Sequence, residues 1–471
     1  MKLFGADVKG LVLHFIGVGG SGMCGLADVL ARQGAVVSGS DGGGKGDYAA
    51  LEAAGVTVYR GHAAEQVSAG ATVVVSTAIP ADNPERLAAE QAGLKIVHRA
   101  EILAEMMGNY QSIAVSGTHG KTSTTALIYT ALKAAGVDVG IINGGRVQAL
   151  GGNALLPRSA KGWLVVEADE SDASFLKLKP TVAVITNIEP EHMATYGSEV
   201  ALVDAFVKFA DSAELVVIGH DDPNAAIVAA RTEADVLTYG MDDGADVYTD
   251  TYSPTRAGGT LPHGGMGMAF DVNVRGGVLE DVVVALPGAH YVQNSLAALA
   301  VASVVKADVV KAAEGLAQFE GVDRRFTRVG TWHGADVIDD YGHHPTEIAA
   351  TLAAAKQVYA GKVIAVIEPH RYSRLGDLLE AFAGCAKVAD AAVILPVYAA
   401  GEAPVEGVNH EVLAAKMQEV GMPAEVHAAA DEGVLNKILH HLHPHAGDVI
   451  VCLGAGSITD IARRLAAHSH H

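Results

Sequence analysis

A glycine-rich turn that directly follows an apolar strand and opens a helix occurs twice in this sequence, which strongly limits the folds open to the chain. The first turn, residues 17–22, follows the apolar run 11–16, and the second, residues 117–120, follows the run 112–116. Each arrangement predicts a parallel β-strand whose crossover helix begins at the turn. The chain is therefore expected to contain at least two α/β layers.

Apolar strand-like runs alternate with Ala- and Leu-rich helical stretches along the whole chain, which is typical of parallel α/β proteins. Further strands are expected at 36–41, 72–76, 163–166, 182–186, 335–338, 362–367, 392–395 and 448–453. Residues 251–275 are rich in glycine, and we expect irregular, exposed hairpins there. The sequence thus predicts an α/β protein of three domains, at 1–108, 109–322 and 323–471.

Composition narrows the class of protein. The 471 residues carry 33 Lys and Arg against 54 Asp and Glu, a net charge of −21, which argues against a nucleic-acid coat but permits small phosphorylated ligands. The longest apolar runs, such as 391–400, are shorter than the roughly 18 residues of a membrane helix, and no export signal is evident. Cys24, Cys385 and Cys452 form no CxxC pair. We expect a reduced, cytoplasmic protein without nucleic-acid or membrane partners.

The first turn matches the G-x-G-x-x-G pattern through Gly17, Gly19 and Gly22, and Asp41 ends the next predicted strand about twenty residues on. Glycines let the backbone approach a diphosphate, and the helix N-terminus supplies N–H donors. The turn alone predicts a dinucleotide or nucleotide diphosphate, with nicotinamide as the default ligand. A tight turn without a ligand is the structural alternative.

The second turn is a shortened P-loop, since Gly117 stands three residues before Gly120 instead of five. Consecutive N–H groups would still wrap phosphates, Lys121 would neutralise their oxygens, and Thr122 would offer Mg²⁺ a hydroxyl. Two phosphate-binding turns favour two different phosphorylated ligands, which weakens a dehydrogenase interpretation.

Acidic and polar residues follow two strands of the second section. Four carboxylates lie within residues 167–172, so a magnesium site is attractive there, with a solvated acidic loop as the alternative. Residues 186–192 are also polar and end at His192. Carboxyl ends of strands are where open α/β sheets bind ligands.

The third section carries cations at its strand ends. Arg371 and Arg374 suit carboxylate or phosphate recognition. The adjacent His343 and His344 could bind zinc, but no clear third ligand accompanies them. Residues 324–325 are two arginines that are either a solvated pair or reach a nucleotide.

Together these motifs resemble the Mur ligases, which build the peptidoglycan precursor, and the resemblance spans essentially the whole chain. It is carried by residues 17–23, 116–122, 167–172, 339–347, 369–374 and 453–456. The family implies a Rossmann-like domain for the UDP-sugar, a central P-loop ATPase domain and a Rossmann-like C-terminal domain that receives the amino acid. The implied reaction forms an acyl phosphate from the carboxylate of UDP-N-acetylmuramate and ATP, and L-alanine then displaces phosphate.

The resemblance also implies the cofactors, which are ATP and Mg²⁺ bound at two positions, and roles for individual residues. Catalytic roles fall on Lys121, Glu167, His192 and Arg325. ATP would contact Gly117, Thr118, His119, Gly120, Lys121, Thr122, Ser123, Asn294, Arg325 and Asp340. The UDP-sugar would contact Gly17, Gly19, Gly20, Ser21, Gly22, Asp41 and Ser76. The amino acid would lie near Tyr341, His343, His370, Arg371 and Arg374. Metal ligands would be Thr122, Glu167 and His192.

Three positions depart from the family pattern. Tyr291 stands where a first asparagine is usual, and Glu191 replaces the aspartate before His192. Several relatives carry a carbamylated lysine near the metal, a role we do not assign to Lys208.

Rival functions remain open within and outside the family. Ser171 favours L-alanine as the acceptor, because the ligase that accepts a whole tripeptide typically has tyrosine there. A dehydrogenase would leave Lys121 and the acidic run without a role, and a silent nucleotide-binding regulator would not need Lys121, Thr122, Glu167 and His192. We expect a monomer or a weak homodimer.

Overall fold

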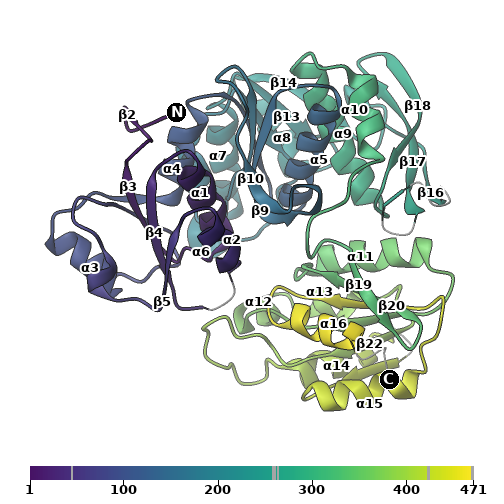
Figure 1. The fold of residues 1–471 in the computed structure, drawn as a ribbon. Coiled ribbons are helices and arrows are strands. Elements are labelled where there is room, and N and C mark those ends of the chain that lie inside the picture. The colour runs from purple at the N-terminus through teal and green to yellow at the C-terminus, as the bar shows by residue number, and fades with distance from the viewer. Residues whose placement is uncertain (44–45, 257–260, 263–264, 422–424, 468–471) are drawn as a thin grey trace. The chain divides into compact units, whose positions relative to one another are not determined.

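The structure, a computed structural model, describes residues 1–43, 46–256, 261–262, 265–421 and 425–467 (Figure 1). Two compact units divide the chain. The first comprises Met1–Asp250, Asp271–Val282 and Gln293–Leu316, and the second comprises Thr251–Phe270, Val283–Val292 and Ala317–His471. Residues 468–471, which include three histidines, lie outside the described residues. Within the described ranges, no helix combines the length and apolar character needed to span a bilayer.

The N-terminal part of the first unit is built on a five-stranded parallel sheet. Its strand order is β5 (Thr57–Arg60), β4 (Val36–Asp41), β3 (Val12–Ile16), β6 (Thr72–Val75) and β7 (Ile96–His98). The helices are α1 (Ser21–Arg32), α2 (Tyr48–Ala53), α3 (Pro84–Gln91) and α4 (Arg99–Met107), and a short hairpin, β1 (Lys2–Leu3) with β2 (Ala6–Asp7), precedes them. The glycine turn between β3 and α1 thus lies at the carboxyl end of a central strand, where such sheets bind ligands.

A second sheet of the first unit carries the shortened P-loop between β8 and α5. Its order is β10 (Gly152–Leu155), β9 (Val139–Val147), β11 (Trp163–Glu167), β8 (Gln111–Ser116), β12 (Val182–Ile185), β13 (Leu215–Gly219), β14 (Asp235–Gly240) and β15 (Val247–Tyr248). The helices are α5 (Lys121–Ala134), α6 (Met193–Tyr196), α7 (Glu199–Ala210), α8 (Pro223–Arg231), α9 (Ala289–Val304) and α10 (Val309–Leu316). From β9 to β15 in this sheet order, neighbouring strands pair in parallel, so their polar carboxyl ends gather at one edge. At the ends of this parallel part, β10 pairs antiparallel with β9, and the sheet continues beyond β15 with β17 (Met266–Val274), which is antiparallel to it.

The second unit contains a six-stranded sheet covered by helices. Its order is β19 (Thr327–Trp332), β20 (Ala335–Asp340), β24 (Val449–Leu453), β21 (Val363–Ile367), β22 (Ala391–Ile394) and β23 (Glu425–Ala428). The helices are α11 (Pro345–Val358), α12 (Tyr372–Asp377), α13 (Leu379–Gly384), α14 (His410–Glu419), α15 (Glu432–Leu442) and α16 (Ile458–Ala467). Leucines of α15 and α16 pack on one face of this sheet, and α11 lies on the other side from α15 in Figure 1.

The predicted α/β fold class is confirmed, and so is each strand that the apolar runs indicated, within a few residues. The described residues of the segment 251–275 form an antiparallel pair, as the expected hairpin implies, but they are regular strands and not irregular chain. They contain β16 (Tyr252–Arg256) and β17 (Met266–Val274), which pair antiparallel, and β18 (Gly277–Val284) follows. Met268 and Val272 of β17 are fully buried, so the expectation of exposure is wrong for this strand. Alternating burial along β17 was hidden in the sequence by its glycine-rich surroundings.

Gly117 begins the P-loop at a point where the backbone leaves no room for a side chain. Its φ is +133°, and a Cβ there would overlap Thr186 Oγ1 and approach Asn187 O to 2.9 Å. Both partners follow β12, the strand next to β8. The close approach of the two strand ends therefore requires glycine at this position.

Replacement of Gly117 by alanine is expected to destabilise the first unit through this overlap. Gly136→Ala is the matched control, because Gly136 has a φ of +78° but nothing within 4 Å of its Cβ position. Both variants carry the cost of a left-handed backbone, and only Gly117→Ala adds overpacking of about 1–3 kcal/mol. Differential scanning calorimetry should show a transition lowered by about 5 °C more for Gly117→Ala. Equal shifts in the two variants would contradict the steric argument.

Candidate active site

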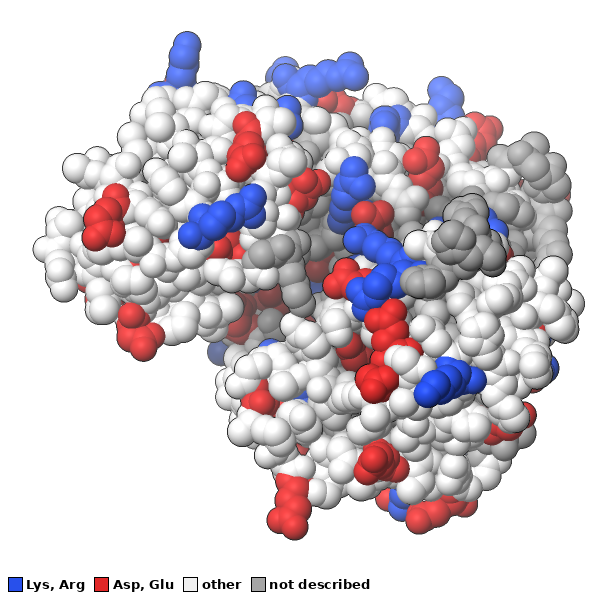
Figure 2. All heavy atoms as spheres, turned by 60° about the horizontal axis from the view of Figure 1, so that its bottom comes forward, with Lys and Arg blue, Asp and Glu red and all other residues white. Residues whose placement is uncertain are grey.

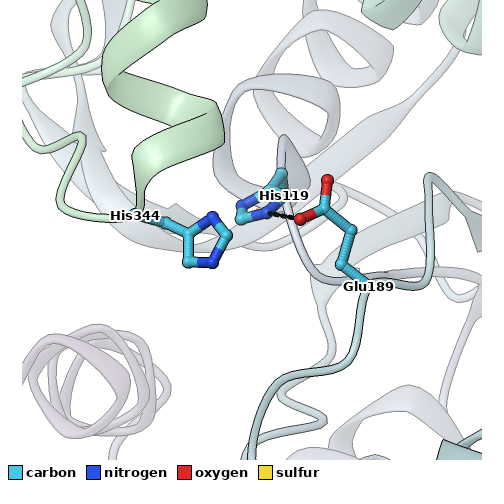
Figure 3. A group of neighbouring side chains, drawn as sticks. All are labelled: His119, Glu189 and His344. Atoms are coloured by element: carbon cyan, nitrogen blue, oxygen red, sulfur yellow. Dashed lines mark ion pairs between the residues drawn. The ribbon is translucent and has the colours of Figure 1, made fainter. Parts of the chain in front are cut away.

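The P-loop is held in shape by the segment that follows β12. Asn187 accepts hydrogen bonds from the backbone N–H of Thr118 (2.9 Å) and, through its side chain, from that of His119 (2.8 Å). Thr186 Oγ1 donates to His119 O at 2.6 Å. Glu189 N donates to Thr118 Oγ1, and the Glu189 carboxylate lies 3.3 Å from His119 Nε2 (Figure 3). The polar run 186–192, expected to face a ligand, is used in part to fix the loop.

Lys121, the first residue of α5, is turned back onto its own loop. Its Nζ donates to Gly117 O (2.6 Å), Thr118 O (3.0 Å) and Glu170 Oε1 (2.8 Å). Burial alone would lower the pKa of Lys121, but the carboxylates of the acidic run outweigh burial and raise it. Lys121 is therefore a charged ammonium group at the carboxyl ends of β8 and β11, where the P-loop interpretation places it.

The four carboxylates of the acidic run have four different partners. Glu167 accepts from Gly144 N at 2.8 Å, and Glu170 pairs with Lys121. Asp169 lies 2.6 Å from Arg99 Nη2, and Asp172 accepts from Thr77 Oγ1 at 2.5 Å. The run is therefore not a single converging acidic cluster, since each side chain is directed to its own donor.

His192 and Thr122 lie near the same strand ends. His192 has a φ of +60° and begins the short helix α6, with its Nε2 3.5 Å from Glu170 Oε1 and 3.5 Å from Glu191 Oε2. Thr122 is buried in the first turn of α5, next to Lys121. A hydroxyl, the Glu167 carboxylate and an imidazole make a donor set that suits Mg²⁺ or Mn²⁺. These residues fit a divalent cation.

The N-terminal glycine turn is clasped by Asp41. Its Oδ2 accepts from Gly19 N at 2.9 Å, and its Oδ1 accepts from Tyr48 OH at 2.7 Å. Asp41 thus orders the turn itself, which the sequence interpretation did not foresee. Ser76 directly follows β6, the strand that pairs with β3, at whose end the turn lies.

A cavity of about 1190 Å³ opens beside this turn within the first unit. It is lined by Gly19, Gly20, Ser21, Asp47, Arg146 and Asn153, among others. The size and the mixture of backbone and charged groups suit a nucleotide sugar. The cavity supports the glycine turn as a ligand site.

Arg99 connects the glycine turn with the acidic run, and sequence reasoning missed it. A Cβ on Gly22 would lie 2.9 Å from Arg99 Nη1, so the guanidinium packs directly against the first turn of α1. The same guanidinium pairs with Asp169. No pattern in the sequence pointed to this contact, because the partners are 70 residues apart.

The predicted residues of the second unit gather around a row of rings. The ring centroids of Tyr341 and His343 are 5.2 Å apart, and those of His343 and His370 are 5.7 Å apart. Tyr398 stacks on His370 with the ring centroids 5.5 Å apart. Burial, followed by the charges of nearby cationic side chains, lowers the pKa of His370 to about 4. His343 Nδ1 lies 3.1 Å from Tyr341 O, whereas His344 caps α11. The zinc interpretation of the adjacent histidines gains no support from these separate roles.

Cationic residues of the second unit flank the same rings. The Arg324 and Arg325 guanidinium groups lie 4.6 and 5.0 Å from the centroid of the Tyr341 ring. Arg371, with a φ of +70°, precedes α12, and Arg374 lies on that helix. Charged side chains of both signs are interspersed on the face drawn in Figure 2.

Asp340 is engaged by the protein's own donors. Its carboxylate accepts from Phe326 N (2.7 Å), Gly342 N (2.8 Å) and Thr351 Oγ1 (3.4 Å). Burial raises its pKa. A ribose hydroxyl would have to share or replace one of these donors.

The expected adenine contact and the atypical Tyr291 lie on the same helix, α9. Asn294 is buried, with its Oδ1 3.0 Å from the Cβ position of Gly120, so it borders the P-loop. Tyr291 packs near Phe319 and against His290. Tyr291 therefore contributes an aromatic contact where an asparagine is usual.

Sequence comparisons agree with this geometry. Models of Mur ligase domains match residues 12–111 (Mur ligase family, catalytic domain), 115–302 (Mur ligase middle domain) and 324–456 (Mur ligase, glutamate ligase domain). A UDP-N-acetylmuramate–L-alanine ligase from Maricaulis maris is 44% identical over 95% of this chain and 94% of the relative.

Structural comparisons point the same way. The UDP-N-acetylmuramate–alanine ligase of Thermotoga maritima has a TM-score of 0.82 at 26% identity, over 97% of this chain and 99% of that one. A murein peptide ligase from Psychrobacter arcticus has a TM-score of 0.67 at 24% identity, over 97% and 98%, and shares the fold. The chain belongs to the Mur ligase family.

His290 generates a pH-dependent prediction. Burial, followed by the charge of Arg325, lowers its pKa from 6.5 to about 4. Below pH 6.5 the unfolded chain therefore binds a proton at His290 that the folded chain does not bind. The stability present above pH 6.5 is lost as the pH falls towards 4. Between pH 7.5 and 5.0, His290→Gln should lose up to about 2 kcal/mol less than the wild type in urea unfolding.

The control is His441→Gln, an exposed histidine of α15 in the same unit. It should retain the pH dependence of the wild type. The same pH dependence in His290→Gln would show that His290 takes up its proton normally in the folded chain.

Proposed function

We propose that this chain joins L-alanine to the carboxylate of UDP-N-acetylmuramate, with hydrolysis of ATP to ADP and phosphate. The observation that carries the proposal is similarity along 95% of the chain to a relative named for this reaction. The P-loop with Lys121, the acidic run and His192 supply groups that such a reaction requires. The reaction would be a step in the synthesis of the peptidoglycan precursor.

The proposed chemistry has two steps. The muramyl carboxylate attacks the γ-phosphorus of ATP, and ADP leaves with the electrons of the broken bond. The neutral amine of L-alanine then attacks the acyl phosphate carbon, phosphate leaves, and the nitrogen loses one proton as the amide forms. Binding at the transition state must offset the repulsion between a carboxylate and a triphosphate.

Residues of the first unit are suited to that task. Lys121 would leave its loop carbonyls and Glu170 to neutralise the β- and γ-phosphates, and the N–H groups of the P-loop would cradle them. Thr122, Glu167 and His192 would hold Mg²⁺, which offsets negative charge on the two reacting groups. Asn294 would contact adenine, and the turn 17–22 with Asp41 and Ser76 would hold the uridine diphosphate.

Residues of the second unit complete the proposal. Arg325 would contact ATP phosphates, and Asp340 would contact the ribose. The amino acid would lie near the rings of Tyr341, His343 and His370 and near Arg371 and Arg374. We retain domain boundaries at 108/109 and 322/323, two Mg²⁺ ions, a cytoplasmic location and a monomer or weak homodimer as parts of this proposal.

The decisive experiment compares amino-acid acceptors. Purified protein with ATP, Mg²⁺ and UDP-N-acetylmuramate is supplied in parallel with L-Ala, L-Ser, Gly and the cell-wall tripeptide, and phosphate release is measured. We expect release to depend on the amino acid and to be fastest with L-Ala. Preference for the tripeptide would overturn the assigned acceptor while leaving the ligase chemistry intact.

Lys121→Ala should slow ADP formation well over tenfold, because the ammonium that meets the phosphates is lost. Binding of UDP-N-acetylmuramate, measured by calorimetry, should change little, since the glycine turn and the cavity beside it are formed by other elements. Lys133→Ala is the matched control, because Lys133 lies on the same helix with an exposed side chain. Near-normal turnover in Lys121→Ala would contradict the P-loop assignment.

A further inference from the structure

Glu170 is a buried carboxylate that the proposed function has so far left without a role toward any ligand. Its side chain is only 2% exposed. Oε1 lies 2.8 Å from Lys121 Nζ and 3.5 Å from His192 Nε2. Within the described part of the chain, Oε2 has no hydrogen-bond partner. A buried carboxylate oxygen without a donor is costly, so a missing group at this place is indicated.

The ion pair with Lys121 competes with the phosphates of a nucleotide that is bound as proposed. Gly117 O, Thr118 O and Glu170 Oε1 together use the three donors of the Lys121 ammonium group. Phosphates can receive this ammonium only if it gives up such partners. Glu170 would then be a buried negative charge that has lost its counter-ion, which is strongly unfavourable.

His192 is held beside Glu170 by the short helix that it begins. Tyr196 OH donates to Glu170 O, and Thr195 Oγ1 donates to Ser171 O at 2.8 Å. Helix α6, which comprises Met193–Tyr196, therefore fixes the backbone of the acidic run relative to His192. The imidazole and the carboxylate form a preset pair, whichever partner Lys121 has.

A carboxylate and an imidazole are ligands that Mg²⁺ and Mn²⁺ accept, and a divalent cation would restore the charge lost with Lys121. We propose that Glu170 and His192 together bind a divalent cation when nucleotide phosphates draw Lys121 away. Glu170 thus changes partner from the lysine to the metal. This proposal rests on the proposed use of ATP, and it assigns Glu170 as a ligand of one of the two cations.

The exchange makes nucleotide and cation binding interdependent. Without nucleotide, Lys121 occupies Glu170 and competes with the cation for it. With nucleotide, the phosphates occupy Lys121, and the buried carboxylate favours the cation. Each ligand should therefore strengthen the binding of the other through Glu170, which is reciprocal coupling between two sites.

The test counts Mn²⁺ bound to the full-length protein by electron paramagnetic resonance, with and without a non-hydrolysable ATP analogue. UDP-sugar and amino acid are omitted. We expect the analogue to add tightly bound Mn²⁺ in the wild type, with one ion fewer, or one bound at least tenfold more weakly, in Glu170→Gln. Glu90→Gln, an exposed change on α3, is the matched control and should behave as wild type.

A second variant separates cation binding from the lysine contact. His192→Gln leaves the Lys121–Glu170 pair intact and should lose the same Mn²⁺, but it also removes a ligand from the set with Thr122 and Glu167. Glu170→Asp, which keeps the charge and draws the carboxylate back by one methylene, should bind this Mn²⁺ more weakly than the wild type, so the test remains decisive if Glu170→Gln folds poorly. An unchanged Mn²⁺ count and affinity in His192→Gln, or in folded Glu170→Gln, would overturn the proposal. Failure of wild-type protein to bind the analogue would instead overturn the proposed use of ATP, and this inference with it.

Discussion

A buried ion pair between Lys121 and Glu170 joins the elements on which the candidate active site depends. The lysine begins α5 after β8, and the glutamate lies just beyond β11, the neighbouring strand. Parallel pairing brings these two strand ends to the same edge, so residues 49 positions apart in sequence meet at 2.8 Å. The next strand on the other side, β12, supplies the segment that holds the P-loop backbone. Sheet order therefore decides which charges meet.

The two glycine turns, which we propose to bind phosphates, have backbones that are stabilised in two different ways. In the N-terminal sheet, the Asp41 carboxylate at the end of β4 receives the Gly19 N–H, so a charged group orders the turn. In the central sheet, the neutral Asn187 receives the N–H groups of Thr118 and His119. A neutral side chain at position 187 suits a loop that is proposed to bind a triphosphate, because a carboxylate there would repel the phosphates.

The acidic run contacts both the N-terminal part of the first unit and its central sheet. Asp169 and Asp172 pair with Arg99 and Thr77 of the N-terminal part, while Glu167 and Glu170 remain with the central sheet. Successive residues point in different directions after a strand ends, so a run of carboxylates is divided among partners. The repulsion that suggested one metal cluster is relieved mainly by separate donors, and the buried oxygen of Glu170 is the exception.

The sequence by itself determined the α/β class, the positions of ten of the strands, both glycine turns and the family, because apolar periodicity and turn chemistry are local properties. It also indicated which segments contain the functional residues. Only the tertiary structure decided that Arg99 meets Asp169, that Asn187 holds the P-loop, and that Glu170 lies between Lys121 and His192. These contacts depend on strand order and on the direction of each side chain, and the partners are separated by tens of residues, so no local pattern encodes them.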